Sequence, residues 1–122
     1  MTLAMIVLAG LMGASGIILA AIAAHTTRGV GLDNAGYLLL FHAIAVLSGV
    51  MLLQQRLLLR PLMLGVLAGW ALGSALFAGD IALRAFVGHR LFSLAAPTGG
   101  IILILAWIAL AATAILALVQ SE

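Results

Sequence analysis

The sequence has 122 residues, of which 66% are hydrophobic and 7% are charged, and its formal net charge is +2. A soluble domain of this size could not bury so much apolar surface, so these values exclude a small water-soluble globule and predict a single membrane domain over residues 1–122. The cationic side chains are scattered arginines without a basic stripe, which argues against nucleic acid, and the absence of cysteine excludes disulfides, thiolate catalysis and cysteine-based metal sites.

Four apolar segments are predicted to be membrane-spanning helices, at about residues 3–24, 35–53, 62–83 and 97–119. Each is close to the ~20 residues that cross a ~30 Å hydrocarbon core as a helix. Strands are excluded because an open sheet would leave backbone groups unpaired in lipid, and a barrel needs more strands than this chain can supply. The first segment contains Ala21-Ile22-Ala23, which resembles a signal-peptide cleavage site, but no Lys or Arg precedes its long apolar run. We therefore expect a retained helix.

Short connections join the four segments, so consecutive helices should be antiparallel neighbours in an all-α, up-down-up-down four-helix bundle. This topology brings most polar side chains to one side of the membrane. That side holds His25, His42, Asp80, Arg84, His89, Arg90 and Thr98, whereas the opposite side holds Gln54, Gln55, Arg56, Arg60 and the chain ends. The arginine counts on the two sides, with Arg28 included, nearly balance and do not decide the orientation.

The third segment carries a stripe of small residues at four-residue spacing, formed by Gly65, Gly69 and Gly73. Such a stripe lets another helix backbone approach closely, which is how membrane helices gain packing energy in lipid. The approaching helix could belong to the same bundle, to a second copy of the chain or to a larger membrane complex. The first segment has another small face, formed by Gly10, Gly13, Gly16, Ala20 and Ala24.

Asp80 is the one acidic residue inside these apolar segments. A carboxylate at mid-membrane costs roughly 2.5–3.5 kcal/mol on insertion scales, so it needs a partner or a purpose. Asp80 lies seven residues after Gly73 and, at about 100° per residue, within roughly 20° of it, so it should face neighbouring helices. Arg84 follows at i, i+4, the favourable order for an ion pair, and can neutralise Asp80 at the membrane edge. Alternatively, Asp80 binds a cation or a proton together with His42.

The histidines on the same side raise the possibility of a metal site. His25, His42 and Asp80 could supply imidazole and carboxylate ligands that suit Zn²⁺ or Cu²⁺, although they lack the sequence spacing of a recognised metal motif. A bis-histidine haem fits less well because the two histidines are offset in depth. Otherwise His42 is a neutral side chain that hydrogen-bonds to a carbonyl or hydroxyl of a neighbour.

The fourth segment opens with Pro97-Thr98-Gly99-Gly100, and proline suits the first position of a helix. Free N–H groups and the helix dipole at Thr98 and Gly99, with Arg84 or Arg90 nearby, could bind an anion such as a lipid phosphate. The simpler interpretation is a close-packed helix start, at which the glycines admit the third helix.

Four short motifs follow one another along the chain: Ala23-Ala24-His25, Phe41-His42-Ala43, Leu76-Phe77-Ala78-Gly79 and Pro97-Thr98-Gly99-Gly100. In this order and spacing they resemble the small bacterial membrane proteins of the domain-of-unknown-function 423 family. The resemblance covers nearly the whole chain. It implies a four-helix inner-membrane protein with no assigned activity, in which the second connection and both termini are cytoplasmic. The family usually has Ser-Gly-Ser where this chain has Ala78-Gly79-Asp80, so it supports His25 and His42 more than Asp80.

These features together predict a non-enzymatic membrane protein, either an accessory or assembly subunit or a binder of lipid or a small ligand. The candidate ligand-binding residues are His25, His42, Asp80, Arg84, Thr98 and Gly99. No cofactor is expected, apart from the Zn or Cu alternative. An oligomeric transporter or channel component for a small ion or proton is the second hypothesis, although only Ser48 and Ser74 lie near mid-membrane. Catalysis has no visible basis, because no serine pattern suggests a nucleophile with its His and acid, and no phosphate-binding loop is present.

Overall fold

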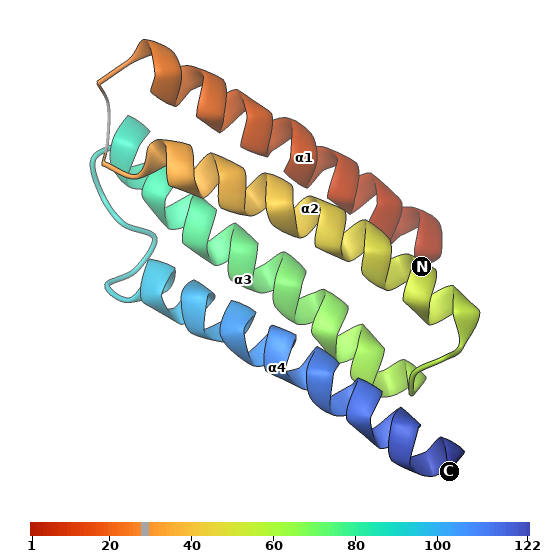
Figure 1. The fold of residues 1–122 in the computed structure, drawn as a ribbon. Helices are drawn as coiled ribbons and strands as arrows, with labels where there is room; N and C mark the ends of the chain where they lie inside the picture. Colours follow the sequence, from red (N-terminus) through yellow and green to blue (C-terminus); the bar gives the residue numbers. More distant parts are fainter. Residues whose placement is uncertain (28–29) are drawn as a thin grey trace.

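The computed structural model describes residues 1–27 and 30–122, and this part of the chain is helical apart from its connections. It contains α1 (Thr2–His25), α2 (Leu32–Gln55), α3 (Arg60–Phe86) and α4 (Ala95–Ser121) (Figure 1). All four helices are long and apolar enough to cross a membrane. The predicted all-α fold of four apolar helices is therefore confirmed. Arg28, counted above among the connection charges, lies outside the described residues.

Each helix is a few residues longer than predicted, because its ends are set by local backbone bonds rather than by hydropathy. Helix α2 ends where Arg56 adopts a left-handed conformation, with φ of 56°, and donates its N–H to the Leu53 carbonyl. Helix α3 ends at Phe86, and Gly88, with φ of 88°, follows it and donates its N–H to the Leu83 carbonyl. Both are left-handed helix stops, and arginine is an unusual residue to provide one.

Helix α4 begins two residues earlier than expected. The sequence predicts Pro97 at the first helical position, but the helix starts at Ala95, so Pro97 is the third residue. The N–H of Thr98 donates to the Leu94 carbonyl, which closes the first turn. Proline is still tolerated there, because the first N–H groups of a helix have no intrahelical acceptor.

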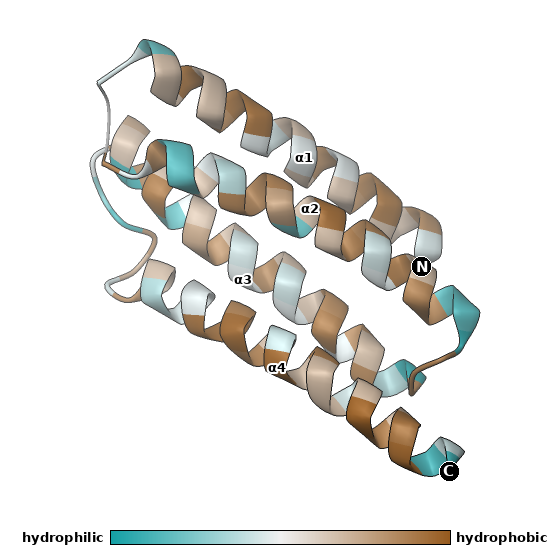
Figure 2. Cartoon of the chain, viewed as in Figure 1, coloured by the Kyte–Doolittle hydropathy of each residue, from teal (hydrophilic) through white to brown (hydrophobic). Residues whose placement is uncertain are grey.

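The four helices form an open bundle in chain order. Extensive contacts in the described chain join α1 to α2, α2 to α3 and α3 to α4, and α1 and α4 form the two edges (Figure 1). Both termini lie at the same end of this arrangement. Hydrophilic residues concentrate at the helix ends and in the connections, with apolar helix bodies between them (Figure 2). The edge helices are therefore the ones with broad apolar faces that no other helix of the chain covers.

Glycines set the contact within each outer helix pair. A Cβ placed on Gly16 of α1 would lie 2.6 Å from the Gly36 carbonyl oxygen of α2, and one on Gly99 of α4 would lie 2.6 Å from the Gly73 carbonyl oxygen of α3. Gly13 of α1 lies opposite Ala43 of α2, whereas Gly16 lies opposite Gly36. The residue numbers in α2 thus fall as those in α1 rise, which means that the two helices run in opposite directions. Backbone-to-backbone contact of this kind is available only to residues without a side chain.

Some glycines of the predicted small-residue stripes pack against a neighbouring helix, and others do not. Gly69 and Gly73 face Ala106 and Leu103 of α4, so this part of the stripe serves the fold of the chain itself. A Cβ placed on Gly65 or on Gly10 would meet no heavy atom within 4 Å. Their faces are left for lipid or for another protein.

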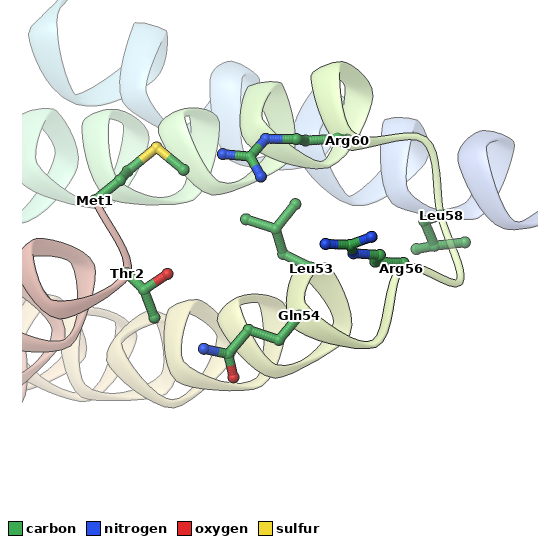
Figure 3. Close-up of a pocket in the computed structure, with 7 residues that line it drawn as sticks. All are labelled: Met1, Thr2, Leu53, Gln54, Arg56, Leu58 and Arg60. Carbon is green, nitrogen blue, oxygen red and sulfur yellow. The ribbon is translucent and has the colours of Figure 1, made fainter.

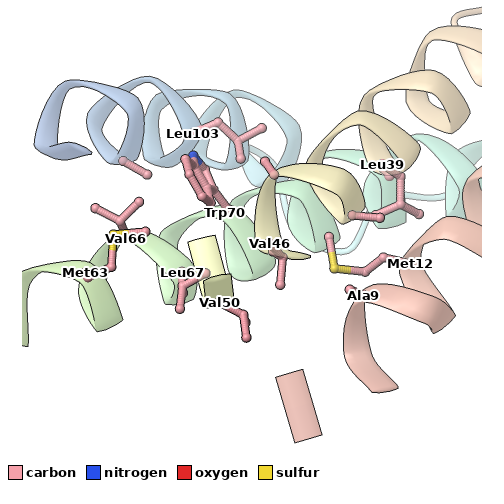
Figure 4. Close-up of a cluster of buried hydrophobic side chains, with 14 of the residues drawn as sticks. Ala9, Met12, Leu39, Val46, Val50, Met63, Val66, Leu67, Trp70 and Leu103 are labelled. Carbon is pink, nitrogen blue, oxygen red and sulfur yellow. The ribbon is translucent and has the colours of Figure 1, made fainter. Parts of the chain in front are cut away.

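The core lies between the two central helices. Its largest side chain is Trp70 of α3, which is 2% exposed and packs with Met63, Leu67 and Val46 (Figure 4). Helices α1 and α4 add only a few small or flexible side chains to it, among them Ala9, Met12, Leu103 and Ala106. Large side chains therefore hold α2 against α3, whereas small residues hold the outer pairs.

Candidate functional site

Asp80 is fully buried near the end of α3, and both oxygens of its carboxylate lie close to polar groups of the same chain. Its Oδ1 accepts the backbone N–H of Leu91 at 3.0 Å, and its Oδ2 lies 3.5 Å from Nε of Arg84. Arg84 is 39% exposed, so it covers the carboxylate from the outer side. Of the two partners considered for Asp80, the structure places Arg84 beside it and turns His42 elsewhere.

The bond to Leu91 has no counterpart in the sequence-based expectations. Leu91 belongs to the connection between α3 and α4, eleven residues after Asp80. Helical phase can place side chains that share a helix, but it cannot tell which backbone N–H of a connection folds back onto that helix. The carboxylate thus has a structural task, which is to fasten this connection to the end of α3.

His42 uses both of its ring nitrogens within the protein. Its Nδ1 lies 2.8 Å from the Leu38 carbonyl, and its Nε2 lies 3.2 Å from the indole Nε1 of Trp107 on α4. An indole N–H can only donate, so Nε2 is the acceptor and Nδ1 carries the proton that is donated to Leu38. This agrees with the expected neutral, hydrogen-bonded histidine, but the carbonyl lies in helix α2 itself and the neighbouring helix supplies an N–H instead. Neither nitrogen has a free lone pair for a metal.

Trp107 is the partner that sequence reasoning missed. Its ring centroid lies 4.6 Å from that of Trp70 and 6.1 Å from that of Phe41, so aromatic side chains of three helices meet at Trp107. The sequence did contain a signal for this contact, because Trp107 is the one residue of the fourth segment that has a side-chain N–H, and it lies at the depth of His42. Buried tryptophans usually donate this N–H to an acceptor.

The predicted cluster of His25, His42 and Asp80 is not assembled. Within residues 1–27 and 30–122, no three His, Cys, Asp or Glu side chains are grouped so that they could hold a metal ion. His25 is exposed at the end of α1, His42 faces Trp107, and Asp80 faces the connection after α3. All three lie toward one end of the bundle, as their depth suggested, but they point in different directions. The structure therefore gives the Zn or Cu alternative no support.

The start of α4 has few donors left for an anion. The N–H groups of Ala95 and Thr98 donate to the carbonyls of Phe92 and Leu94, and Pro97 has no N–H. Gly99 is buried against Gly73 and Phe77 of α3. Arg90 donates to the Ser93 carbonyl within its own connection. The close-packed interpretation of Thr98 and Gly99 fits these contacts, and the lipid-phosphate interpretation does not.

The hydroxyl groups inside the helices are also engaged. Ser48 donates to the Ile44 carbonyl, Ser74 to the Trp70 carbonyl and Thr113 to the Ala109 carbonyl, each one turn back in its own helix. Such bonds satisfy a hydroxyl locally and leave it little capacity to bind a passing ion. The described helices thus offer no chain of free polar groups across the bundle.

A different polar cleft opens at the opposite end of the bundle, between the start of α1 and the connection from α2 to α3. It has a volume of about 650 Å³ and is lined by Met1, Thr2, Leu53, Gln54, Arg56, Leu58 and Arg60 (Figure 3). The polar residues of this side are visible in the sequence, but their pattern predicts no site. The cleft contains two arginines, and its lining includes no acidic side chain.

Comparison with known proteins adds no assignment: no protein family, curated protein or solved structure matches this chain. Its function has to be argued from the faces and clefts that the structure presents.

Proposed function

We propose that this chain is a non-enzymatic integral membrane protein that acts as an accessory or assembly subunit, with edge helix α1 packed against a transmembrane helix of a neighbouring protein. The observation that carries the proposal is the outer face of α1. Only 17% of its most apolar stretch is buried, the same share as in the other edge helix, α4, compared with 44% for α2. A helix joined to its own chain on one narrow side has the rest of its surface available for a partner.

The exposed face of α1 has the spacing of a helix-packing seam. Its members alternate steps of four and three residues, and all are exposed: Leu3, Val7, Gly10, Ala14, Ile17 and Ala21. This alternation matches the positions that meet along left-handed helix pairs. The centre of the seam is small, at Gly10 and Ala14, which allows a second backbone to come close.

The other edge helix, α4, repeats this spacing on its outer face but lacks the small centre. The outer face of α4 carries bulky branched residues, with Ile101, Ile104 and Ile108 each 58–61% exposed. Such a surface suits fluid acyl chains better than a closely packed helix. The contrast between the two edges supports α1 as the protein-contacting one.

The setting of the protein is part of the same proposal. The four motifs that resemble the domain-of-unknown-function 423 family support a place in the bacterial inner membrane, with both termini in the cytoplasm. Membership of that family remains a prediction. The arginine counts on the two sides nearly balance, so the orientation rests on this resemblance alone.

Single-site photo-crosslinking tests the proposal, and because the chain has no native cysteine, an introduced cysteine is the one position of the chain that is labelled. A cysteine-linked photo-crosslinker at Ala14 in native membranes should give one discrete protein adduct, either a second copy or another membrane protein. The matched control is the same label at Ile108, which is 59% exposed on α4. The substitution Gly10→Trp, introduced into the variant labelled at Ala14, should abolish the adduct. It should not unfold the protein, because the tryptophan side chain would project into open space in the free chain. Lipid adducts alone at Ala14, or the same protein adduct at both positions, would refute the proposal.

A further inference from the structure

The cleft at the α2–α3 connection carries positive charge that the protein does not neutralise. Among the described residues, the ion pair between Arg84 and Asp80 is the only one, and it lies at the other end of the bundle. Neither Arg56 nor Arg60 has an acidic partner within the cleft. Two guanidinium groups at one cleft without a carboxylate are suited to an anion that the protein does not supply.

The geometry of the cleft favours a phosphate group. Both guanidinium groups extend from the connection in the same direction, toward the helix bodies and over Leu53 (Figure 3). The amide of Gln54 and the hydroxyl of Thr2 add neutral donors to the lining. Guanidinium groups match the oxygens of a phosphate with paired donors, and the volume of about 650 Å³ falls within the usual range for ligand pockets.

The residues around the cleft favour a lipid over a soluble anion. Three leucines separate the two arginines, and Leu57 and Leu59 are 62% and 44% exposed. Such a connection is poorly suited to water but well suited to the boundary between headgroups and acyl chains. Basic residues at that depth lie beside lipid phosphates.

Arg56 also occupies a backbone position that normally favours glycine. Its φ of 56° lies in the left-handed region, where a side chain is strained. The chain ends α2 with this residue nevertheless, and the turn directs its guanidinium into the cleft. Strained backbone is common where a side chain has to be held for binding.

We propose that the cleft formed by Thr2, Leu53, Gln54, Arg56, Leu58 and Arg60 binds the phosphate of an anionic phospholipid headgroup, while the adjoining leucines contact its acyl chains. This inference is independent of the α1 interface. It places lipid recognition at the end opposite His25, His42 and Asp80.

The test is a lipid titration of the purified full chain in phosphatidylcholine nanodiscs, with phosphatidylglycerol as the probe and binding read by native mass spectrometry. Each of Arg56→Gln and Arg60→Gln should weaken phosphatidylglycerol binding about 5-fold, and the double variant about 25-fold. Arg90→Gln removes the same charge from an exposed position at the other end and should change binding less than 2-fold, a bound we set at roughly the spread of a neutral surface change. Circular dichroism of each variant checks that its fold is retained.

Three outcomes would overturn the proposal. The first is a double variant that binds phosphatidylglycerol as the unmodified chain does, because the two arginines would then not hold the lipid. The second is an Arg90→Gln variant that loses binding as much as the double variant does, because positive charge would then act without a specific site. The third comes from competition with glycerol phosphate, which carries the headgroup chemistry but no acyl chains. Displacement at equal concentration would assign the cleft to a soluble anion, whereas a lipid site requires a large excess of the competitor.

Discussion

At the scale of single residues, the two buried ionisable groups of the helices both have polar partners within the chain, although Oδ2 of Asp80 has the Arg84 ion pair and no hydrogen bond. Asp80 accepts the Leu91 N–H and lies beside Arg84, and His42 joins α2 to α4 through Trp107. Burying a carboxylate without such bonds would cost several kcal/mol, on the order of the desolvation of one ion. These residues therefore stabilise the fold, and they leave ligand binding to other parts of the surface.

Replacing Asp80 should loosen the connection between α3 and α4. Asp80→Ala removes the acceptor of the Leu91 N–H and should lower the free energy of unfolding by about 1.5–3 kcal/mol, the range for hydrogen bonds to charged groups. Asp80→Asn keeps an acceptor oxygen and should cost less. Titration with SDS measures the stability, and hydrogen exchange of residues 87–94 locates the effect. Asp33→Asn, a matched change at an exposed acid, should stay within about 0.5 kcal/mol. Unchanged exchange in residues 87–94 of Asp80→Ala would contradict this role.

The hydrogen bond between His42 and Trp107 should appear as a coupling energy. In a double-mutant cycle of His42→Ala and Trp107→Phe, we expect about 0.6 kcal/mol and at most about 1.7 kcal/mol, the average and the maximum for side-chain hydrogen bonds between membrane helices. Unfolding free energies of the two single variants and the double variant provide the measurement. A cycle that pairs Trp107→Phe with His25→Ala serves as the control and should show no coupling, because His25 lies at the exposed end of α1. Equal coupling in the two cycles would rule out a specific bond.

At the scale of the helix, contact distances separate glycines that the sequence cannot tell apart. Gly16 and Gly99 lie against the backbone of a neighbouring helix, whereas Gly10 and Gly65 face open space. Gly10, Gly16 and Gly65 all stand in similar stripes of small residues, and Gly99 stands in the glycine pair at the start of α4. The difference depends on which side of each helix meets its neighbour, and that is a property of the assembled structure.

Alanine substitutions should therefore divide into two groups. Gly16→Ala and Gly99→Ala force the helices apart and should destabilise the protein by about 1–3 kcal/mol, as overpacked cores do. Gly10→Ala and Gly65→Ala add no clash and should be neutral or stabilising by roughly 0.5–1 kcal/mol, because alanine favours a helix more than glycine does. Thermal unfolding in one detergent compares all four. Similar losses at Gly10 and Gly16 would mean that the close contact does not matter.

At the scale of the whole molecule, the sequence predicts the helices well and their mutual rotation poorly. Hydropathy located all four helices to within a few residues, since the length of an apolar run is fixed by the thickness of a bilayer. Depth also placed His25, His42 and Asp80 near one end. The directions in which these three side chains point depend on which helices pack together. The contacts of His42 with Trp107 and of Asp80 with the Leu91 N–H can therefore be seen only in the folded structure. The cleft at Arg56 and Arg60 depends on the path of a connection, which hydrophobic periodicity does not describe.

The paired glycine contacts have a consequence for how the protein is made. Gly16 meets Gly36, and Gly73 meets Gly99, so each contact joins two helices that are consecutive in the chain. A hairpin of α1 and α2 can close as soon as α2 enters the bilayer, before α3 has been synthesised, and a second hairpin of α3 and α4 can close in the same way. We expect the bulky contact around Trp70 to form after these two hairpins, so that assembly takes two local closures and one docking step.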